Sequence, residues 1–320
     1  MKLSKGHHLK NSLSCNRKTI PTIAAAFALI VTCGCADSEP DASNTAAPPV
    51  KRAAASDDPP VLLPRELRRK LNANDNAKFV RSGNDIVEAQ LVESGVKSIE
   101  ALKGVPLRFL DLGMTSVSDI SPVAGMPLET LILEDTPVAD LSPIKGISLK
   151  VLYLQNTKVT DLSVLKGMPI EMLNLKSVPV TDLSIVAELP LNTLWIPDTK
   201  IDDISPLQGK AMVSLDIEGT AVSSLAPLAD MSTLKRLNIA RTPITDVSPL
   251  KGIKLQRITL TPDTVREGMD VLKDMPSLTE IRTTMEGPAQ SAAEFWAKYD
   301  RGVWNIPAKT DNEAPAQEGK

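Results

Sequence analysis

Side chains that commonly carry nucleophilic, acid–base or zinc chemistry are confined to the start of the chain. Both histidines, His7 and His8, and all three cysteines, Cys15, Cys33 and Cys35, lie within the first 35 of 320 residues. The rest of the sequence therefore cannot form a Ser-His-Asp or Cys-His site, and it lacks the usual zinc ligands. It also has no glycine-rich phosphate-binding loop. We expect no catalytic residues, no metal site and no cofactor.

Neighbouring carboxylates are the remaining candidates for acid–base work. The pairs are Glu134-Asp135 and Asp202-Asp203, and Glu134, Asp135 and Asp198 together are a conceivable site for a hard cation. Acidic residues recur at such places at a fixed period, however, which indicates solvated or capping positions. Their spacing also matches no calcium-binding loop. We therefore expect neither catalysis nor a cation site from them.

Cys35 has a context that suggests export and lipid attachment. Residues 1–34 begin with a basic segment, continue with the nine apolar residues 23–31 and end in small residues, the order of a signal peptide. Gly34-Cys35 resembles the end of a bacterial lipobox, although Thr32 stands where that motif prefers leucine. The resemblance implies a lipidated Cys35, and Ala36 after it favours the outer membrane, facing the periplasm or the cell surface. The alternative is a plain secretory signal that leaves Cys35 as a free thiol.

The segment after the signal is a tether. Residues 35–60 are rich in Ala, Ser, Pro and Asp and have no apolar periodicity, so we expect them to be disordered.

Without residues 1–34, which hold five basic and no acidic side chains, the chain has 31 basic and 39 acidic residues, a net charge of −8. An acidic chain without a basic stripe argues against nucleic acid as a partner.

Residues 86–284 repeat one sequence unit. LETLILEDTPVADLSPIKGIS, residues 128–148, returns as LKVLYLQNTKVTDLSVLKGMP 21 residues later. Units begin at Ile86, Leu107, Leu128, Leu149, Ile170, Leu191, Met212, Leu234 and Leu255, and a last strand begins at Leu278. A fixed period with the spacing L-x-x-L-x-L is that of a leucine-rich repeat. The predicted fold is an α/β leucine-rich repeat solenoid with a parallel concave sheet, short convex helical turns and two terminal caps.

The residue types that recur in each unit have a physical explanation. Leu131 and Leu133 are two residues apart, so both point inward from a strand. Thr136 recurs in most units where such repeats often carry Asn, and we expect its buried hydroxyl to bond a neighbouring turn. Ser142 before Pro143 fits a helix N-cap, and Gly146 fits the helix stop. Only one helical turn fits between them.

The recurring Asp-x-Ser-Pro element, as in residues 119–122, 140–143, 203–206 and 246–249, resembles that of internalin-type bacterial leucine-rich repeats. The resemblance covers about 200 residues, departing in its threonine column and in a unit one residue shorter. It implies a protein that binds other proteins through the concave sheet, without identifying a partner.

The ends of the array are expected to be covered. Residues 61–85 predict a short helix and a hairpin, an N-terminal cap. Residues 285–305 hold Phe295, Trp296, Tyr299 and Trp304, interpreted as a helical C-terminal cap or, alternatively, as an aromatic binding platform. Residues 306–320 are polar and predicted to be a disordered tail.

Side chains between the inward leucines should face the concave side. Tyr153 and Trp195 belong to one such column with Asn174 between them, and stacking at about 4.8 Å per strand predicts some 10 Å between the two aromatics. The predicted binding surface consists of Phe109, Ile132, Val151, Tyr153, Met172, Asn174 and Trp195, with Arg236 and Arg257 in the C-terminal half. Tyr and Trp in an exposed apolar patch are typical binding hot spots. The alternative is ordinary surface, or cross-strand packing.

The sequence thus favours a non-enzymatic, membrane-tethered module that binds a protein or peptide on its concave face. Two alternatives stay open. One is a structural envelope scaffold or adhesin without a discrete hot spot, and the other is a module that binds an envelope glycan.

Overall fold

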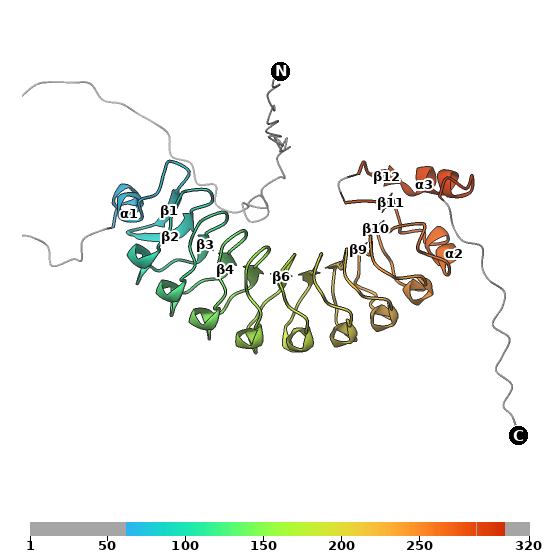
Figure 1. The fold of residues 1–320 in the computed structure, drawn as a ribbon, viewed down its shortest axis with the longest axis horizontal. Helices are drawn as coiled ribbons and strands as arrows, with labels where there is room; N and C mark the ends of the chain where they lie inside the picture. Colours follow the sequence, from blue (N-terminus) through green and yellow to red (C-terminus); the bar gives the residue numbers. More distant parts are fainter. Residues whose placement is uncertain (1–61, 286, 305–320) are drawn as a thin grey trace, which may run out of the picture. The chain divides into compact units, whose positions relative to one another are not determined.

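The computed structural model describes residues 62–285 and 287–304, which form a twelve-stranded sheet in sequence order from β1 to β12. Strands β2 to β11 pair in parallel, while β1 and β12 pair antiparallel at the two ends. Short 3₁₀ turns follow the strands, and the units lie along an arc with the sheet on its concave side (Figure 1). The predicted solenoid of parallel concave strands and short convex turns is confirmed.

The strands are short and regular. They are β1 Lys78–Ser82, β2 Asp85–Gln90, β3 Phe109–Asp111, β4 Thr130–Ile132, β5 Val151–Tyr153, β6 Met172–Asn174, β7 Thr193–Trp195, β8 Ser214–Asp216, β9 Arg236–Asn238, β10 Arg257–Thr259, β11 Glu280–Arg282 and β12 Gln290–Ser291. The 3₁₀ turns are η2 Glu100–Leu102, η3 Ser121–Val123, η4 Ser142–Ile144, η5 Ser163–Leu165, η6 Ser184–Glu188, η7 Ser205–Leu207, η8 Ala226–Leu228 and η9 Ser248–Leu250. The α-helices are α1 Pro64–Lys70, α2 Met269–Lys273 and α3 Ala292–Tyr299.

The core is a stack of aliphatic side chains between sheet and turns. In β4 the middle residue, Leu131, is fully buried while its neighbours are half-buried, and Leu133 is buried just after the strand. Ile144 of η4 closes the same layer from the convex side. Because the layer repeats in each unit, the buried residues form one continuous cluster from Leu67 to Phe295.

The threonine column bonds within its own turn rather than to a neighbouring one. Thr136 Oγ1 donates to the Leu133 carbonyl at 2.6 Å, three residues upstream. The same bond forms at Thr115, Thr157, Thr199, Thr220 and Thr242. The prediction of a bond to the next turn was wrong, because the tight turn after the strand brings the carbonyl of the same unit closer to the hydroxyl.

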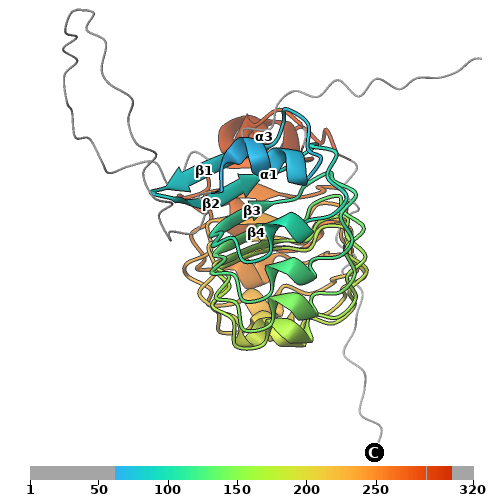
Figure 2. The same cartoon turned by 90° about the vertical axis from the view of Figure 1, so that its left-hand side faces the viewer.

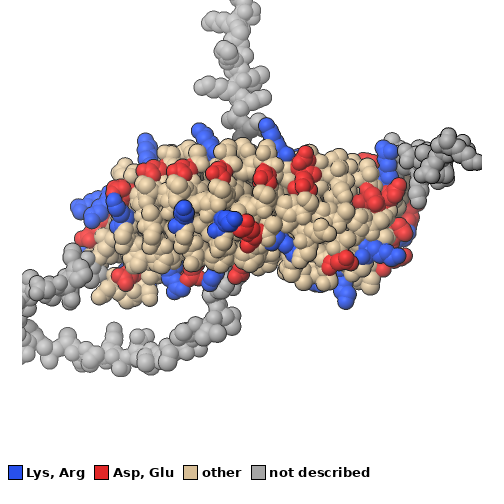
Figure 3. Space-filling model, turned by 90° about the horizontal axis from the view of Figure 1, so that it is seen from below, with Lys and Arg blue, Asp and Glu red and all other residues tan. Residues whose placement is uncertain are grey.

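Six of the eight described 3₁₀ turns are capped by an aspartate, not by the serine at the position predicted from the sequence. Ser142 is already the first residue of η4, and its amide donates to Asp140 Oδ1 at 2.8 Å. Asp119, Asp161, Asp182, Asp203 and Asp246 do the same in their units. Figure 3, a view of the convex side, shows acidic side chains evenly spaced in a row. Gly146 has φ +78°, the left-handed geometry expected of a helix stop.

Both ends of the described array are covered. Helix α1 and the β1–β2 hairpin lie over the first units (Figure 2). At the other end Phe295 of α3 is fully buried, and its ring stacks on Trp304 with centroids 4.8 Å apart. Trp296 packs edge-on against Phe295 at 5.0 Å. This packing favours the cap interpretation of the aromatic segment over a binding platform.

Two features of the fold lie outside what the sequence predicted. Helix α2 and strand β12 were not expected, and α2 occupies the longer, 23-residue unit that begins at Leu255.

Among the described residues, no helix is long and apolar enough to cross a membrane. The predicted signal peptide, tether and C-terminal tail, residues 1–34, 35–60 and 306–320, lie outside the described part of the chain.

The aspartate caps predict how stability responds to acid. Hydrogen bonds from the following serine, chiefly from its amide at Asp119, Asp140, Asp161 and Asp182 and from its hydroxyl at Asp203, hold the pKa of each carboxyl below its ordinary value. A carboxyl whose pKa is lower in the folded than in the unfolded state stabilises the fold at pH values above its unfolded-state pKa. This stabilisation is lost as the pH falls through the folded-state pKa. We therefore expect urea midpoints to fall as pH drops below about 4.

A control comes from the chain itself. In two other units Ser98 and Ser224 supply the capping acceptor through a hydroxyl, which does not titrate. A variant with Asp161→Ser and Asp182→Ser should lose less stability between pH 5 and pH 3 than the wild type does. Equal losses in both proteins would contradict the capping argument.

Candidate binding surface on the concave sheet face

The predicted surface residues occupy two columns of the parallel sheet. In register, Val151 and Met172 are neighbours in one column, and Tyr153, Asn174 and Trp195 follow one another in the other. The apolar members, Phe109, Ile132, Val151, Tyr153, Met172 and Trp195, are all half-buried rather than exposed. Stacked neighbours on a concave face crowd and partly cover each other, so the surface is a packed layer instead of the exposed patch predicted.

The two central aromatic rings contact each other. The centroids of Tyr153 and Trp195 are 5.9 Å apart with a 47° angle between ring planes, against the predicted spacing of about 10 Å. Their strands are separated by β6, so both side chains must lean toward each other across it. The Tyr153 hydroxyl also donates to Met172 Sδ at 2.9 Å. Burial, and secondarily the charge of Glu134, raise the pKa of Tyr153.

Asn174 holds the backbone rather than facing a partner. Its side chain is only 5% exposed, its Oδ1 accepts from the Lys176 amide at 3.0 Å, and its Nδ2 donates to Gln155 Oε1 at 2.7 Å. The polar residues at the same column position, Asp111, Asp216 and Asn238, bond the amide two residues on in the same way. Asn174 is therefore removed from the predicted binding surface, because it is buried and its amide bonds its own turn and Gln155 of the preceding unit.

Three carboxylates on the concave face were not among the predicted binding residues. Asp111, Glu134 and Asp216 are half-buried, make no ion pair with described residues, and have pKa values raised chiefly by burial. At Glu134 the nearby charges of Asp135 and Asp111 add to this. Asp216, next to Trp195 in register, has its pKa raised to about 6. Asp111 and Asp216 occupy the same column as Tyr153 and Trp195, and Glu134 was interpreted from the sequence as a solvated or capping position.

The arginines of the C-terminal half differ from one another. Arg257 is half-buried and pairs with Glu280 at 2.8 Å, a carboxylate that also accepts from Arg282. Arg236 is exposed and makes no ion pair with described residues. The basic character predicted for this half is therefore largely neutralised, and Arg236 carries what remains.

Arg241 is neutralised as well. It bridges Asp198 at 2.8 Å and Glu218 at 2.9 Å, reaching two units back along the array. Gly219 makes this bridge possible, because a Cβ there would lie 2.5 Å from Asp198 Oδ1 and 3.1 Å from Arg241 Nη2. Asp198 is thereby committed to Arg241. Within the described residues, no group of three potential metal ligands exists.

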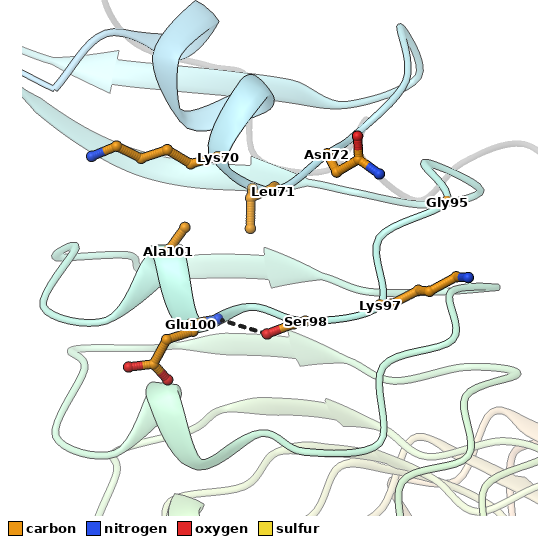
Figure 4. A pocket seen from close by; sticks show the side chains of 8 residues that line it. All are labelled: Lys70, Leu71, Asn72, Gly95, Lys97, Ser98, Glu100 and Ala101. Carbon is orange, nitrogen blue, oxygen red and sulfur yellow. Dashed lines mark hydrogen bonds between the residues drawn. The ribbon is translucent and has the colours of Figure 1, made fainter.

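Two hollows elsewhere on the described surface lie where neighbouring units of the array meet. One lies where the end of α1 meets the first unit and is lined by residues such as Leu71, Lys97 and Ala101 (Figure 4). Its one internal hydrogen bond joins the Glu100 amide to Ser98 Oγ at 3.4 Å. Another follows the edge where Glu129 binds both Arg108 and Lys150. Neither contains an aromatic side chain that could anchor a partner, so the concave face is the better candidate.

Comparison with solved structures agrees with the geometry. An internalin (inlF) from Listeria monocytogenes is similar with 25% sequence identity and a TM-score of 0.53, over 60% of this chain and 65% of that chain. An internalin C2 from the same species shares 28% identity with a TM-score of 0.50, over 55% of this chain and 81% of that one. This chain thus covers just under two thirds of the first. No protein-family model and no curated protein matches the sequence. The described array is a leucine-rich repeat solenoid, similar in fold to these two internalins.

Asp216 predicts a pH-dependent cost in stability. The folded-state pKa of Asp216, about 6, exceeds the ordinary value of 3.8, so the fold favours the neutral carboxyl. The protein therefore has the full stability from this group below about pH 4 and loses it as the pH rises through 6. Asp216→Asn removes this cost, and Asn238 in the next unit shows that Asn keeps the turn. The variant should gain about 1–3 kcal/mol of unfolding free energy at pH 7.5 and little at pH 4, measured by urea unfolding. Exposed Asp202→Asn should show no such trend; a pH-independent gain at Asp216 would contradict the argument.

Proposed function

We propose that this chain is a non-enzymatic binding module of the bacterial cell envelope, which holds a protein or peptide partner on its concave sheet. Solenoids present such faces as extended binding surfaces. The observation that carries the proposal is the Tyr153–Trp195 pair, two large rings in contact on the concave side, at positions that vary from unit to unit. Half-buried aromatics at the centre of a surface are typical anchors for a partner.

The cellular setting belongs to the same proposal. The lipobox-like Gly34-Cys35 supports a lipid anchor at Cys35, and the Ala-, Ser- and Pro-rich residues after it support a tether that holds the array away from a membrane. Ala36 favours the outer membrane. These residues lie outside the described structure, so the sequence alone supports this part.

A competing function has its own support. The aromatic pair is half-buried and Tyr153 bonds Met172, so both rings also stabilise the sheet. This packing favours the scaffold or adhesin alternative, in which the pair is structural. Replacing Tyr153 and Trp195 with Ala should therefore lower the melting temperature, since an aromatic pair contributes about 0.5–1.5 kcal/mol beyond its buried area.

Binding and scaffolding can be separated by matched aromatic substitutions. Trp296 and Tyr299 of the C-terminal cap are also half-buried, with ring centroids 5.4 Å apart. We expect the double variant Tyr153→Ala/Trp195→Ala to lose a discrete partner captured from detergent-solubilised envelope, whereas Trp296→Ala/Tyr299→Ala retains it. Loss of melting temperature should be of similar size in both variants. Capture is quantified from the pulled-down fraction by mass spectrometry.

The reverse result would locate binding at the C-terminal aromatics. If the two variants capture the same amount of partner and both remain associated with the envelope, the result would indicate a scaffold. Either outcome contradicts the proposal for the concave face.

The anchor has a separate test. Mass spectrometry of the mature protein should find an acylated Cys35 as its first residue, and Cys35→Ala should release the protein from the membrane fraction. A mature N-terminus at or near Cys35 without acylation would instead indicate a plain secretory signal.

A further inference from the structure

Carboxylates flank the aromatic pair on both sides along the array. Glu134 lies close enough to Tyr153 for its charge to raise the pKa of the phenol. On the other side Asp216 of β8 is paired in register with Trp195 of β7. Asp111 extends the acidic side, since its charge acts on Glu134. We call these five residues the acid–aromatic cluster.

The cluster is electrostatically incomplete within the described chain. Its three carboxylates are half-buried, and none forms an ion pair, while the surrounding acidic residues Asp198 and Glu218 are already bound to Arg241. Unpaired charges removed from water are costly, and like charges close together raise the cost. A positive charge supplied from outside would lower this cost on binding.

Among the described residues, the charge of Lys176 acts on both sides of the cluster. It lowers the pKa of both Glu134 and Asp216, as the weakest contribution at each. It forms no ion pair with either carboxylate, and its side chain is exposed. Lys176 therefore offsets the negative charge of the cluster only weakly, and a cation bound directly at the carboxylates would offset more of it.

The rings add a second, independent reason for a cation. The π faces of Trp and Tyr attract a guanidinium or ammonium group, by about 0.5–2 kcal/mol depending on how far it is desolvated. An arginine can stack on a ring while its N–H groups donate to a carboxylate at the ring's edge. Anions have a poorer site on this face, because Arg257, Arg282 and Arg241 are already paired and only Arg236 of the predicted surface is exposed without an ion pair to a described residue.

We propose that the acid–aromatic cluster recognises a cationic side chain, an arginine above all, on an extended basic segment of a protein partner. The inference rests on the proposed function, since it gives the chemistry of the partner held by the same concave face. A guanidinium lies against the ring at one end of the cluster and donates hydrogen bonds to the carboxylate beside it, Glu134 near Tyr153 or Asp216 next to Trp195. The two carboxylates belong to units four strands apart, so a second cationic residue of the same extended segment reaches the other end. Specificity arises from the sign of the charge, while the rings supply contact area.

The test uses peptides of known charge. The full chain is titrated with acetyl-Gly-Arg-Gly-Arg-Gly-amide and with the matched Glu and Gln peptides, while the indole N–H signal of Trp195 is followed by NMR. Trp195→Phe identifies that signal among the three tryptophans. The Arg peptide should give a saturable shift with a dissociation constant in the millimolar range, and the Glu peptide should give none below about 10 mM.

Variants of opposite expected sign sharpen the result. Glu134→Gln/Asp216→Asn should weaken binding of the Arg peptide about fivefold or more, while Lys176→Gln, which removes the internal competitor, should strengthen it about twofold. The control Glu100→Gln/Asp202→Asn makes the same charge change away from the concave face and should bind within about twofold of wild type. Because Asp216→Asn is expected to stabilise the protein, weaker binding cannot be attributed to unfolding.

Several results would overturn the inference. These are no saturable shift with the Arg peptide, equal binding of the Arg, Gln and Glu peptides, or equal affinity in the cluster and control variants. The two proposals fail separately. If envelope capture depends on Tyr153 and Trp195 while peptide charge has no effect, the concave face binds a partner but not through a cation.

Discussion

Parallel pairing of three-residue strands is the constraint on which this molecule depends. Each strand bonds to the next at one register, so Leu131 lies beside Leu110 and Leu152 without a slip. A shift of one residue would turn every inward leucine outward. All units must therefore supply the same inward residues, the same left-handed turn after the strand and the same capped 3₁₀ turn. Only the outward positions between the leucines are free to differ, and binding specificity must reside there.

This division explains how far the sequence could predict the structure. Period and residue type settle the strands, their order and their inward faces, because each depends only on backbone spacing. Period does not tell which carbonyl a buried hydroxyl reaches, so Thr136 was assigned to the wrong turn. It does not show that Asp140 rather than Ser142 is the cap, since both recur together. Helix α2 was missed because it lies in an atypical unit of 23 residues.

Side-chain direction limited the prediction of the candidate surface. Strand spacing places the backbones of Tyr153 and Trp195 correctly, but the rings lean together over β6 and halve the expected separation. Asn174 was predicted to face outward, yet an Asx amide next to a tight turn is drawn to the backbone instead. Its signal was available: the column position carries Asp or Asn in four units, and each bonds the amide two residues on.

The same column separates structural from functional acids. A turn at this position is satisfied by the neutral amides of Asn174 and Asn238, so the backbone does not need a charge there. Asp216 nevertheless carries a carboxyl at this position, and burial disfavours its charged form. Burial also disfavours the charged form of Glu134, which is not one of the aspartates that cap the 3₁₀ turns. Stability alone would favour the amide at both positions, since a neutral group is cheaper to bury. Costs of this kind are typical of functional sites, where stability is exchanged for binding. A purely structural role explains the contact between the two rings, but it does not explain why carboxylates that form no ion pair with a described residue stand on either side of them.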